Sequence, residues 1–232
     1  MKQSRVNFAN IYAKYQALGK GNVRLTQSSL YLLQDISASK TVYTFDVLEN
    51  QAGTVNPEEI KLNINDEFIS TEMGVYLQGT MGTITDGVFT PTDSKHLITY
   101  PLYNNNALTA VQQTMLYNGT VRIAVNNVVY MEKFDTRKFG FIPRTPFSSA
   151  VANTNSASMA SNDYSNDAMF ELAPMVTYSG AKKNEITVSI PQAIASGRYD
   201  FVDDGGQAYG LLIDKIAFVC RGLLAQNASR FQ

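Results

Sequence analysis

This chain of 232 residues has little of the side-chain chemistry that most enzymes use, with one cysteine, one histidine and no tryptophan. A single cysteine, Cys220, excludes an internal disulfide and a metal site of several thiolates, and its apolar surroundings predict a small buried hydrophobe. His96 is the only imidazole, and its place at a predicted strand start favours a structural role over acid–base catalysis. The sequence has no nucleophile elbow, P-loop or dinucleotide fingerprint. We therefore predict a protein that is not an enzyme.

Paired carboxylates are the remaining route to hydrolysis, because a glycosidase needs two of them facing one groove. Three pairs are adjacent in sequence: Glu58-Glu59, Asp66-Glu67 and Asp203-Asp204. Neighbours on a strand point to opposite faces and neighbours in a loop face water, so we interpret the pairs as solvated turns. Asp200, Asp203 and Asp204 precede Gly205-Gly206 and offer oxygens to calcium, but without the spacing of an EF-hand. We assign no catalytic residue, metal, cofactor or small-molecule substrate.

Charge is also scarce, since 17% of residues are charged against about a quarter in ordinary proteins. The net charge of −1 gives the whole chain no field that attracts nucleic acid or a membrane. No acidic residue precedes Asp35, however, so the amino-terminal segment is basic. Its candidate contact residues are Lys2, Arg5, Lys14 and Lys20. Three interpretations stay open: a solvated terminus, an arm on nucleic-acid phosphates, or an arm on lipid headgroups.

Long apolar runs are absent from the sequence. None approaches the roughly 20 residues that cross a bilayer, and polar residues interrupt the amino terminus where a signal peptide needs an apolar core. The expected place of synthesis is therefore a cytoplasm.

The sequence does contain strong strand patterns, and the clearest is a hairpin between Gly119 and Pro143. Its strands alternate apolar and polar residues, and Asn126-Asn127 suits the positive φ angles of a two-residue turn. The predicted cross-strand pairs are Val125–Val128, Ile123–Tyr130 and Val121–Glu132. One side of this hairpin is apolar, so it needs a second sheet to cover it.

Elsewhere the periodicity of two predicts strands at 24–36, 41–48, 60–64, 68–77, 96–102, 170–178, 185–190 and 211–224. The pair 170–178 and 185–190 is expected to form a second hairpin, and 211–224 a strand buried on both faces. We interpret 79–94 as a loop or short exposed hairpin and 197–210 as a loop. Apolar spacing of three and four predicts an amino-terminal helix at 6–18 and an inserted helix at 104–117.

The predicted fold class is all-β, with antiparallel jelly-roll barrels. Residues 148–166 are rich in Ser, Asn and Ala and mark a boundary or a long connection. The expected organisation is a helical arm at 1–21, a first jelly-roll unit at 22–145 and a second, smaller unit at 146–232. A single barrel with insertions is the alternative.

This layout resembles the major capsid proteins of small tailless icosahedral bacteriophages, in particular the membrane-containing double jelly-roll lineage that includes phages of Flavobacteria. The similar features are the basic helical arm at 6–18, the helix 104–117 before the hairpin 120–132, and the second β-unit at 170–220. The resemblance implies a structural virion protein, a homotrimer that tiles a shell beside other virion proteins, with its arm towards an internal membrane or the genome. Two alternatives remain, a β-sandwich that binds a glycan or receptor as a decoration protein or adhesin, and another virion component such as a neck protein.

Overall fold

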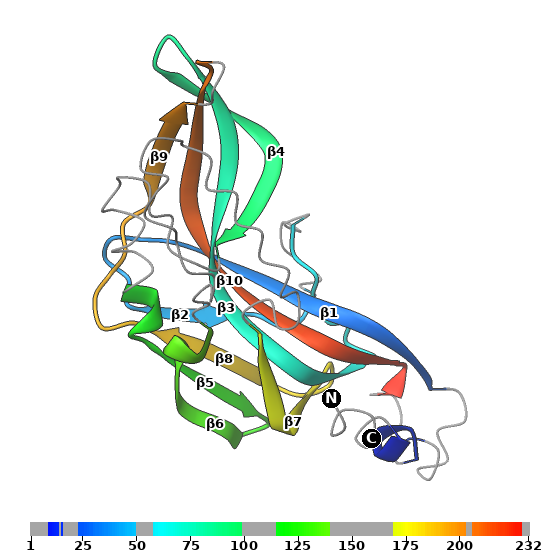
Figure 1. The fold of residues 1–232 in the computed structure, drawn as a ribbon. Coiled ribbons are helices and arrows are strands. Elements are labelled where there is room, and N and C mark those ends of the chain that lie inside the picture. Colours follow the sequence, from blue (N-terminus) through cyan, green and yellow to red (C-terminus); the bar gives the residue numbers. More distant parts are fainter. Residues whose placement is uncertain are drawn as a thin grey trace, which may run out of the picture.

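A computed structural model describes residues 9–13, 15, 23–49, 58–98, 115–139, 169–202 and 206–228 (Figure 1). Its strands are β1 (Arg24–Asp35), β2 (Val42–Phe45), β3 (Glu67–Thr85), β4 (Val88–Ile98), β5 (Thr120–Val125), β6 (Val128–Asp135), β7 (Phe170–Ser179), β8 (Asn184–Ser189), β9 (Gly197–Val202) and β10 (Ala208–Gln226), with a 3₁₀ helix η1 (Thr136–Phe139). These elements confirm the all-β class. Across the described residues the strands form two antiparallel sheets and no closed barrel, so the predicted barrels are not seen.

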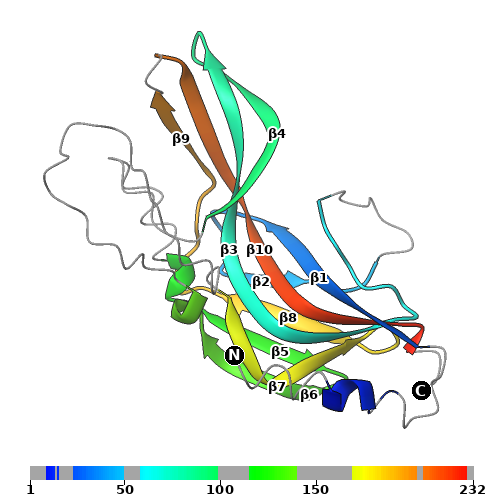
Figure 2. The same ribbon diagram turned by 45° about the vertical axis from the view of Figure 1, so that its right-hand side comes forward.

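The larger sheet has six strands and is built around β3 and β10, which have 19 residues each. The two strands pair along most of their length. Towards one end their outer neighbours are β1 and β7, and towards the other end they are β9 and β4. The smaller sheet has the order β2-β8-β5-β6 and lies against the lower half of the larger one (Figures 1 and 2).

The main core lies between the two sheets. Ile216, Phe218 and Cys220 of β10 are fully buried and face Tyr43 and Phe45 of β2 across this core. The Phe45 and Phe218 ring centroids are 5.7 Å apart. The predicted alternation of 41–48 and the burial of Cys220 are therefore confirmed, and the last strand is buried on both faces over 216–220.

The predicted hairpin is present as β5 and β6. Asn126 and Asn127 have φ angles of 51° and 65°, and Val125 pairs with Val128, as expected. The next two predicted pairs are wrong, because Ile123 lies opposite Met131 and Val121 opposite Phe134. Two β-bulges cause the shift, since β6 has extra residues at Tyr130 and at Lys133, which has a φ of 52°. The tip is exposed and lies at one end of the smaller sheet.

The segment 79–94, expected to be a loop or a short exposed hairpin, is a hairpin that is longer than expected, and 197–210, expected to be a loop, is mostly strand in its described residues. The first forms the far half of a long hairpin between β3 and β4, with its turn at Asp86-Gly87. The second contains β9, which pairs with the start of β10. Their low hydrophobicity has a physical reason: no described strand of the smaller sheet covers this half of the larger sheet (Figures 1 and 2).

Strands β7 and β8 occur where the sequence predicts them, but they do not form the expected hairpin. β7 pairs with β3 in the larger sheet, whereas β8 pairs with β2 and β5 in the smaller one. The short polar connection between them therefore crosses from one layer to the other. Each sheet contains strands from both sides of the predicted boundary between residues 145 and 146, so the described strands do not divide there.

The described part of the amino-terminal helix, residues 9–13 and 15, is helical and packs against the β-body. Ile11 and Tyr15 are buried against Ile69, Ala225 and Ala228. Of the predicted inserted helix, residues 115–117 are helical, while 104–114 lie outside the described residues, as does the boundary segment 148–166. Within the described ranges no helix has the length and apolar character to span a membrane.

Candidate functional site

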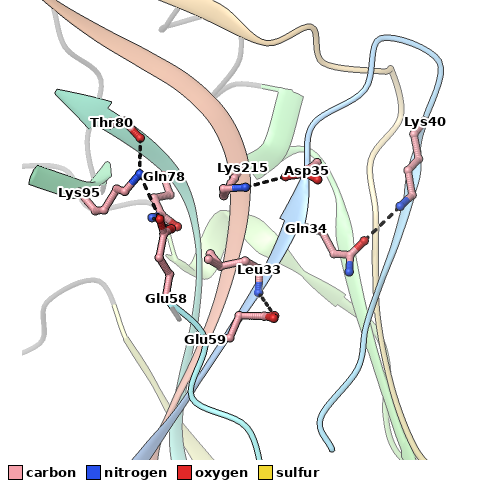
Figure 3. Close-up of polar contacts among 10 residues, drawn as sticks. All are labelled: Leu33, Gln34, Asp35, Lys40, Glu58, Glu59, Gln78, Thr80, Lys95 and Lys215. Carbon is pink, nitrogen blue, oxygen red and sulfur yellow. Dashed lines mark hydrogen bonds and ion pairs between the residues drawn. The ribbon is translucent and has the colours of Figure 1, made fainter. Parts of the chain in front are cut away.

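A group of charged and amide side chains lies on the outer face of the larger sheet, away from the main core, and Figure 3 draws most of its members. We call it the outer-face cluster, and its members are Asp35, Glu58, Gln78, Thr80, Lys95, Asp214 and Lys215. Strand register brings most of them together, because directly paired residues of antiparallel strands share a face. Asp35, Lys215 and Gln78 form one row across β1, β10 and β3, and Thr80 pairs with Lys95 of β4.

Glu58 holds the centre of the cluster. Its Oε1 lies 3.1 Å from the ammonium of Lys95, and its Oε2 accepts a 3.2 Å hydrogen bond from the amide of Gln78. Lys95 also donates to the hydroxyl of Thr80 at 2.9 Å. Gln78 is almost completely buried, at 1% exposure. One carboxylate therefore joins the segment after residue 57 to both β3 and β4.

The same segment continues along the edge of β1. The backbones of Tyr31 and Ile60 exchange two hydrogen bonds of 2.9 Å, and the amide of Leu33 donates to Glu59 Oε1 at 2.9 Å (Figure 3). Glu59 Oε2 also lies 3.1 Å from Lys61. The interpretation of Glu58-Glu59 as a solvated turn is therefore wrong, because both carboxylates are used to attach this segment to the sheet.

Lys215 and Asp214 occupy a β-bulge in β10. Lys215 donates to Asp35 at 2.7 Å. Burial lowers the pKa of Lys215, but the hydrogen bond to Asp35 and the nearby carboxylates outweigh it, so the pKa is raised overall. A lysine nucleophile needs a lowered pKa, so Lys215 is suited to ion pairing and not to covalent catalysis.

Two acceptor atoms of the cluster, Gln78 Oε1 and Asp214 Oδ1, are buried and have no hydrogen-bond donor among the described residues. Burial raises the pKa of Asp214, and the charges of Lys215 and Lys95 oppose that effect. The same two ammonium groups disfavour a metal ion beside these oxygens. In the described ranges no three His, Cys, Asp or Glu side chains are grouped so as to hold a metal.

The residues singled out in the sequence are not brought into one site. Lys2, Arg5, Lys14 and Lys20 lie outside the described residues, as do Asp203 and Asp204. His96 is exposed on β4 and lies opposite Gly79, on the face away from its neighbour Lys95. Asp200 accepts two hydrogen bonds from Arg198, of 2.7 and 3.0 Å, so its carboxylate is used in an ion pair.

Glu67 is a second acidic residue for which the interpretation as part of a solvated turn is wrong. It is 3% exposed at the start of β3, and its Oε2 accepts a 2.5 Å hydrogen bond from the hydroxyl of Tyr15. Asp66 beside it accepts a 2.8 Å hydrogen bond from the backbone of Asn227. This carboxylate pair anchors the amino-terminal helix and the carboxyl-terminal segment to the same end of the sheet, so it is not a solvated turn.

The other prominent surface is a projection, the β-arm, formed by residues 79–98, 197–202 and 206–213 (Figures 1 and 2). Its strand order is β9-β10-β3-β4. On one face the ring of Phe89 lies across Gly82 and Gly210, where a side chain on either glycine would collide with it. The guanidinium of Arg198 lies 5.8 Å from the centre of this ring. The β-arm is therefore an ordered sheet with side-chain packing of its own.

Comparison of the chain with protein-family models, with curated proteins and with solved structures found no match.

Proposed function

We propose that this chain is a structural subunit that assembles with copies of itself, and that the assembly is the shell of an icosahedral virion built from homotrimers. The observation that carries the proposal is the β-arm. It extends the larger sheet beyond the smaller one, so that half of β3 and β10 has no second described layer (Figures 1 and 2). A sheet in a stable protein needs another layer against at least one face.

The exposed side chains of the β-arm support this interpretation. Val88 at its tip is 65% exposed and Leu97 is 38% exposed. Met81, Ile84 and Leu212 are only half-buried. By strand register Val88 and Met81 lie on one face of the β-arm, and Ile84, Leu97 and Leu212 on the other. Exposed apolar side chains on both faces of a projecting element offer contact surface, and identical copies can supply the partner.

The outer-face cluster supports a structural role as well. Glu58 joins the segment after residue 57 to β4 by an ion pair and to β3 by a hydrogen bond, and the ion pair of Lys215 with Asp35 joins β10 to β1. The low content of charge, at 17%, suits a subunit with extensive contacts, because the centres of protein interfaces are depleted of charged residues.

The test is the oligomeric state of the full chain, measured by mass photometry and electron microscopy. We expect trimers at low concentration and larger, curved assemblies as the concentration rises. The variant Val88→Asp should weaken assembly, because it puts a charge on the β-arm, whereas Val42→Asp on the smaller sheet serves as the control. A wild-type chain that stays a monomer at high concentration contradicts the proposal. Glycan binding by that monomer would favour the binding-module alternative.

For the basic amino terminus we propose contact with an internal membrane or with the packaged genome. The variant that replaces Lys2, Arg5, Lys14 and Lys20 with Gln should lose binding to anionic vesicles in the first case and to DNA or RNA in the second. Unchanged binding to all of them would show that the segment is an ordinary solvated terminus.

A further inference from the structure

The first half of β1 is a free strand edge. β1 is the outermost strand on one side of the larger sheet (Figures 1 and 2), and it pairs with β10 without a register shift from Arg24 to Asp35. The described segment that does reach its outer edge, at residues 59–60, bonds to the backbones of Tyr31 and Leu33. Residues 24–29 therefore have no other strand on that side among the described residues.

The backbone groups of this edge point outwards at every second residue. Tyr31 exchanges two hydrogen bonds of 2.9 Å with Ile60, so its N–H and C=O point away from β10. Successive residues of an antiparallel strand bond alternately to one side and to the other, so Leu25, Gln27 and Ser29 also point away from β10. Each of them offers one N–H and one C=O, and these groups have no hydrogen-bond partner among the described residues.

This stretch of β1 has none of the features that protect sheet edges. Natural edges are guarded by proline, bulges, charged side chains or short length. Residues 24–29 read RLTQSS, with no proline and with one charge, Arg24, at the end. Their pairing with β10 is regular, so the row of outward donors and acceptors is regular too. The edge is therefore able to add another strand.

The other described edges are all guarded. β4 contains Pro91 and a bulge, and β7 contains Pro174 and a bulge. β6 has two bulges, β2 has four residues, and β9 presents the ion pair of Arg198 with Asp200. Among the strands that the structure describes, only β1 has an edge that is open to regular pairing.

We propose that two copies of this chain pair their β1 edges antiparallel about a two-fold axis at Gln27, so that their larger sheets join into one. Gln27 then lies opposite the second copy's Gln27, and Leu25 opposite its Ser29, with about six hydrogen bonds between the two strands. This inference rests on the proposed function, because a shell of trimers needs a contact between trimers as well as the contact within each one.

The dimensions of the free edge match a second β1. In this register the added strand begins with its Arg24 opposite Leu30, next to Tyr31, where Ile60 already occupies the edge. The second strand thus fills the free length without displacing Ile60. The two Arg24 side chains lie at opposite ends of the contact, about 20 Å apart, with uncharged residues between them.

A second copy is also favoured over a flexible peptide and over the chain's other edges. A flexible peptide loses conformational entropy at every residue that it orders, and this short edge returns few hydrogen bonds. A strand that is already ordered in a folded sheet avoids that loss. Because the other described edges are guarded, the ordered strand that an assembly of identical copies supplies is another β1.

The first experiment places a charge on the two-fold axis. Gln27 is exposed and its backbone does not bond to β10, so Gln27→Lys and Gln27→Thr should both fold like the wild type. In the contact, Gln27→Lys puts two ammonium groups opposite each other, which should raise the dissociation constant between trimers at least about tenfold in sedimentation equilibrium. Gln27→Thr, a neutral strand former, should change it by less than about twofold.

The second experiment measures backbone hydrogen exchange. The amides of Leu25, Gln27 and Ser29 should exchange rapidly in the dilute, unassociated chain and at least about tenfold more slowly when the wild type associates. A contact through side chains alone would leave these amides unprotected and refute the proposal. Protection already present in the unassociated chain would show that the edge is filled within one copy, and would refute it as well.

The third experiment tests the register. Directly paired residues of an antiparallel ladder have Cα atoms about 4.5–5.5 Å apart, within the range of a disulfide. Mild oxidation should therefore join two copies of Gln27→Cys, whereas two copies of Ser29→Cys, about 14 Å apart in this register, should stay separate. The natural Cys220 is fully buried and does not compete.

The failure of this contact is distinguishable from the failure of the proposed function. A wild-type chain that stays a monomer at high concentration refutes both. If the chain assembles but Gln27→Lys and Gln27→Thr associate alike, only the β1 contact is refuted. Equal cross-linking of Gln27→Cys and Ser29→Cys refutes the two-fold axis at Gln27.

Discussion

Replacement of Phe218 by alanine tests whether the chain has one core or two. Phe218 lies in the middle of β10, is fully buried, and its ring centroid is 5.7 Å from that of Phe45. Phe45 belongs to the smaller sheet, and to the other side of the boundary predicted at residue 145. The substitution therefore removes a contact that joins both sheets and both halves of the chain.

The expected loss can be worked from this burial. Truncation of a buried phenylalanine to alanine costs about 3–5 kcal/mol, because apolar contact is lost and a cavity remains. With a urea dependence of about 2–3 kcal/mol per molar for a chain of this size, the unfolding midpoint should fall by roughly 1–2 M. The protein has no tryptophan, so tyrosine fluorescence and far-ultraviolet circular dichroism are the suitable probes. Measurement at low protein concentration separates folding from assembly.

The control is Val42→Ala, at an exposed position of the smaller sheet, which should change the unfolding free energy by less than about 0.5 kcal/mol. In a single core, Phe218→Ala shifts one transition, and the two probes agree. If unfolding shows two separate transitions, and Phe218→Ala shifts only the transition of the later half of the chain, the shared core is refuted. A loss below about 1 kcal/mol would refute the packing of Phe218 between the sheets.

Three further outcomes are expected. Tyr15→Phe should lower the free energy of unfolding by about 1–3 kcal/mol, because buried Glu67 loses a hydrogen-bond donor. Hydrogen exchange should rise first in the amino-terminal helix, and unchanged exchange there would contradict this anchor. Glu58→Ala should lower the free energy of unfolding in urea by about 1–3 kcal/mol, because Glu58 accepts a hydrogen bond from the buried amide of Gln78. Asp35→Ala should lower it by less than about 1 kcal/mol, because the Asp35 side chain is 83% exposed; equal losses would contradict the central role of Glu58. Burial and the charge of Glu58 raise the pKa of Tyr31 to about 12. The free energy of unfolding should therefore fall as the pH rises from about 10, where the tyrosine of the unfolded chain ionises, through about 12. Glu58→Gln should lower this pKa in an ultraviolet titration, and an unchanged value would contradict the coupling.

Local patterns predicted much of the secondary structure correctly. The alternation of 41–48, the turn at Asn126-Asn127 and the doubly buried last strand depend on residues close in sequence, and all three are present. The register of β6 beyond Val128 was not predictable, because bulges respond to packing against the opposite sheet. For 79–94 the hairpin alternative was correct, but its length was not predicted, because polar and glycine-rich stretches form long strands when long neighbours such as β10 extend them.

The outer-face cluster shows why the candidate site could not be found in the sequence. Asp35 and Lys215 are paired across 180 positions, and Gln78 and Glu58 across 20. No local motif relates these residues, and the acidic pair at 58–59 looks like a solvated turn when read alone. The pairing of β1 with β10 and of β10 with β3 places Asp35, Lys215 and Gln78 in one row, and Glu58 reaches this row from the segment before β3.

The sequence by itself determined the all-β class, the positions of most strands and the scarcity of catalytic side chains, because each of these depends on composition or on a spacing of a few residues. Only the tertiary structure decided which strands pair, that the two halves of the chain share both sheets, and that β3 and β10 extend past the core as the β-arm. The physical reason is that strand pairing is made by backbone hydrogen bonds, which are nearly independent of residue type. Partners distant in sequence are then selected by the packing of the whole core.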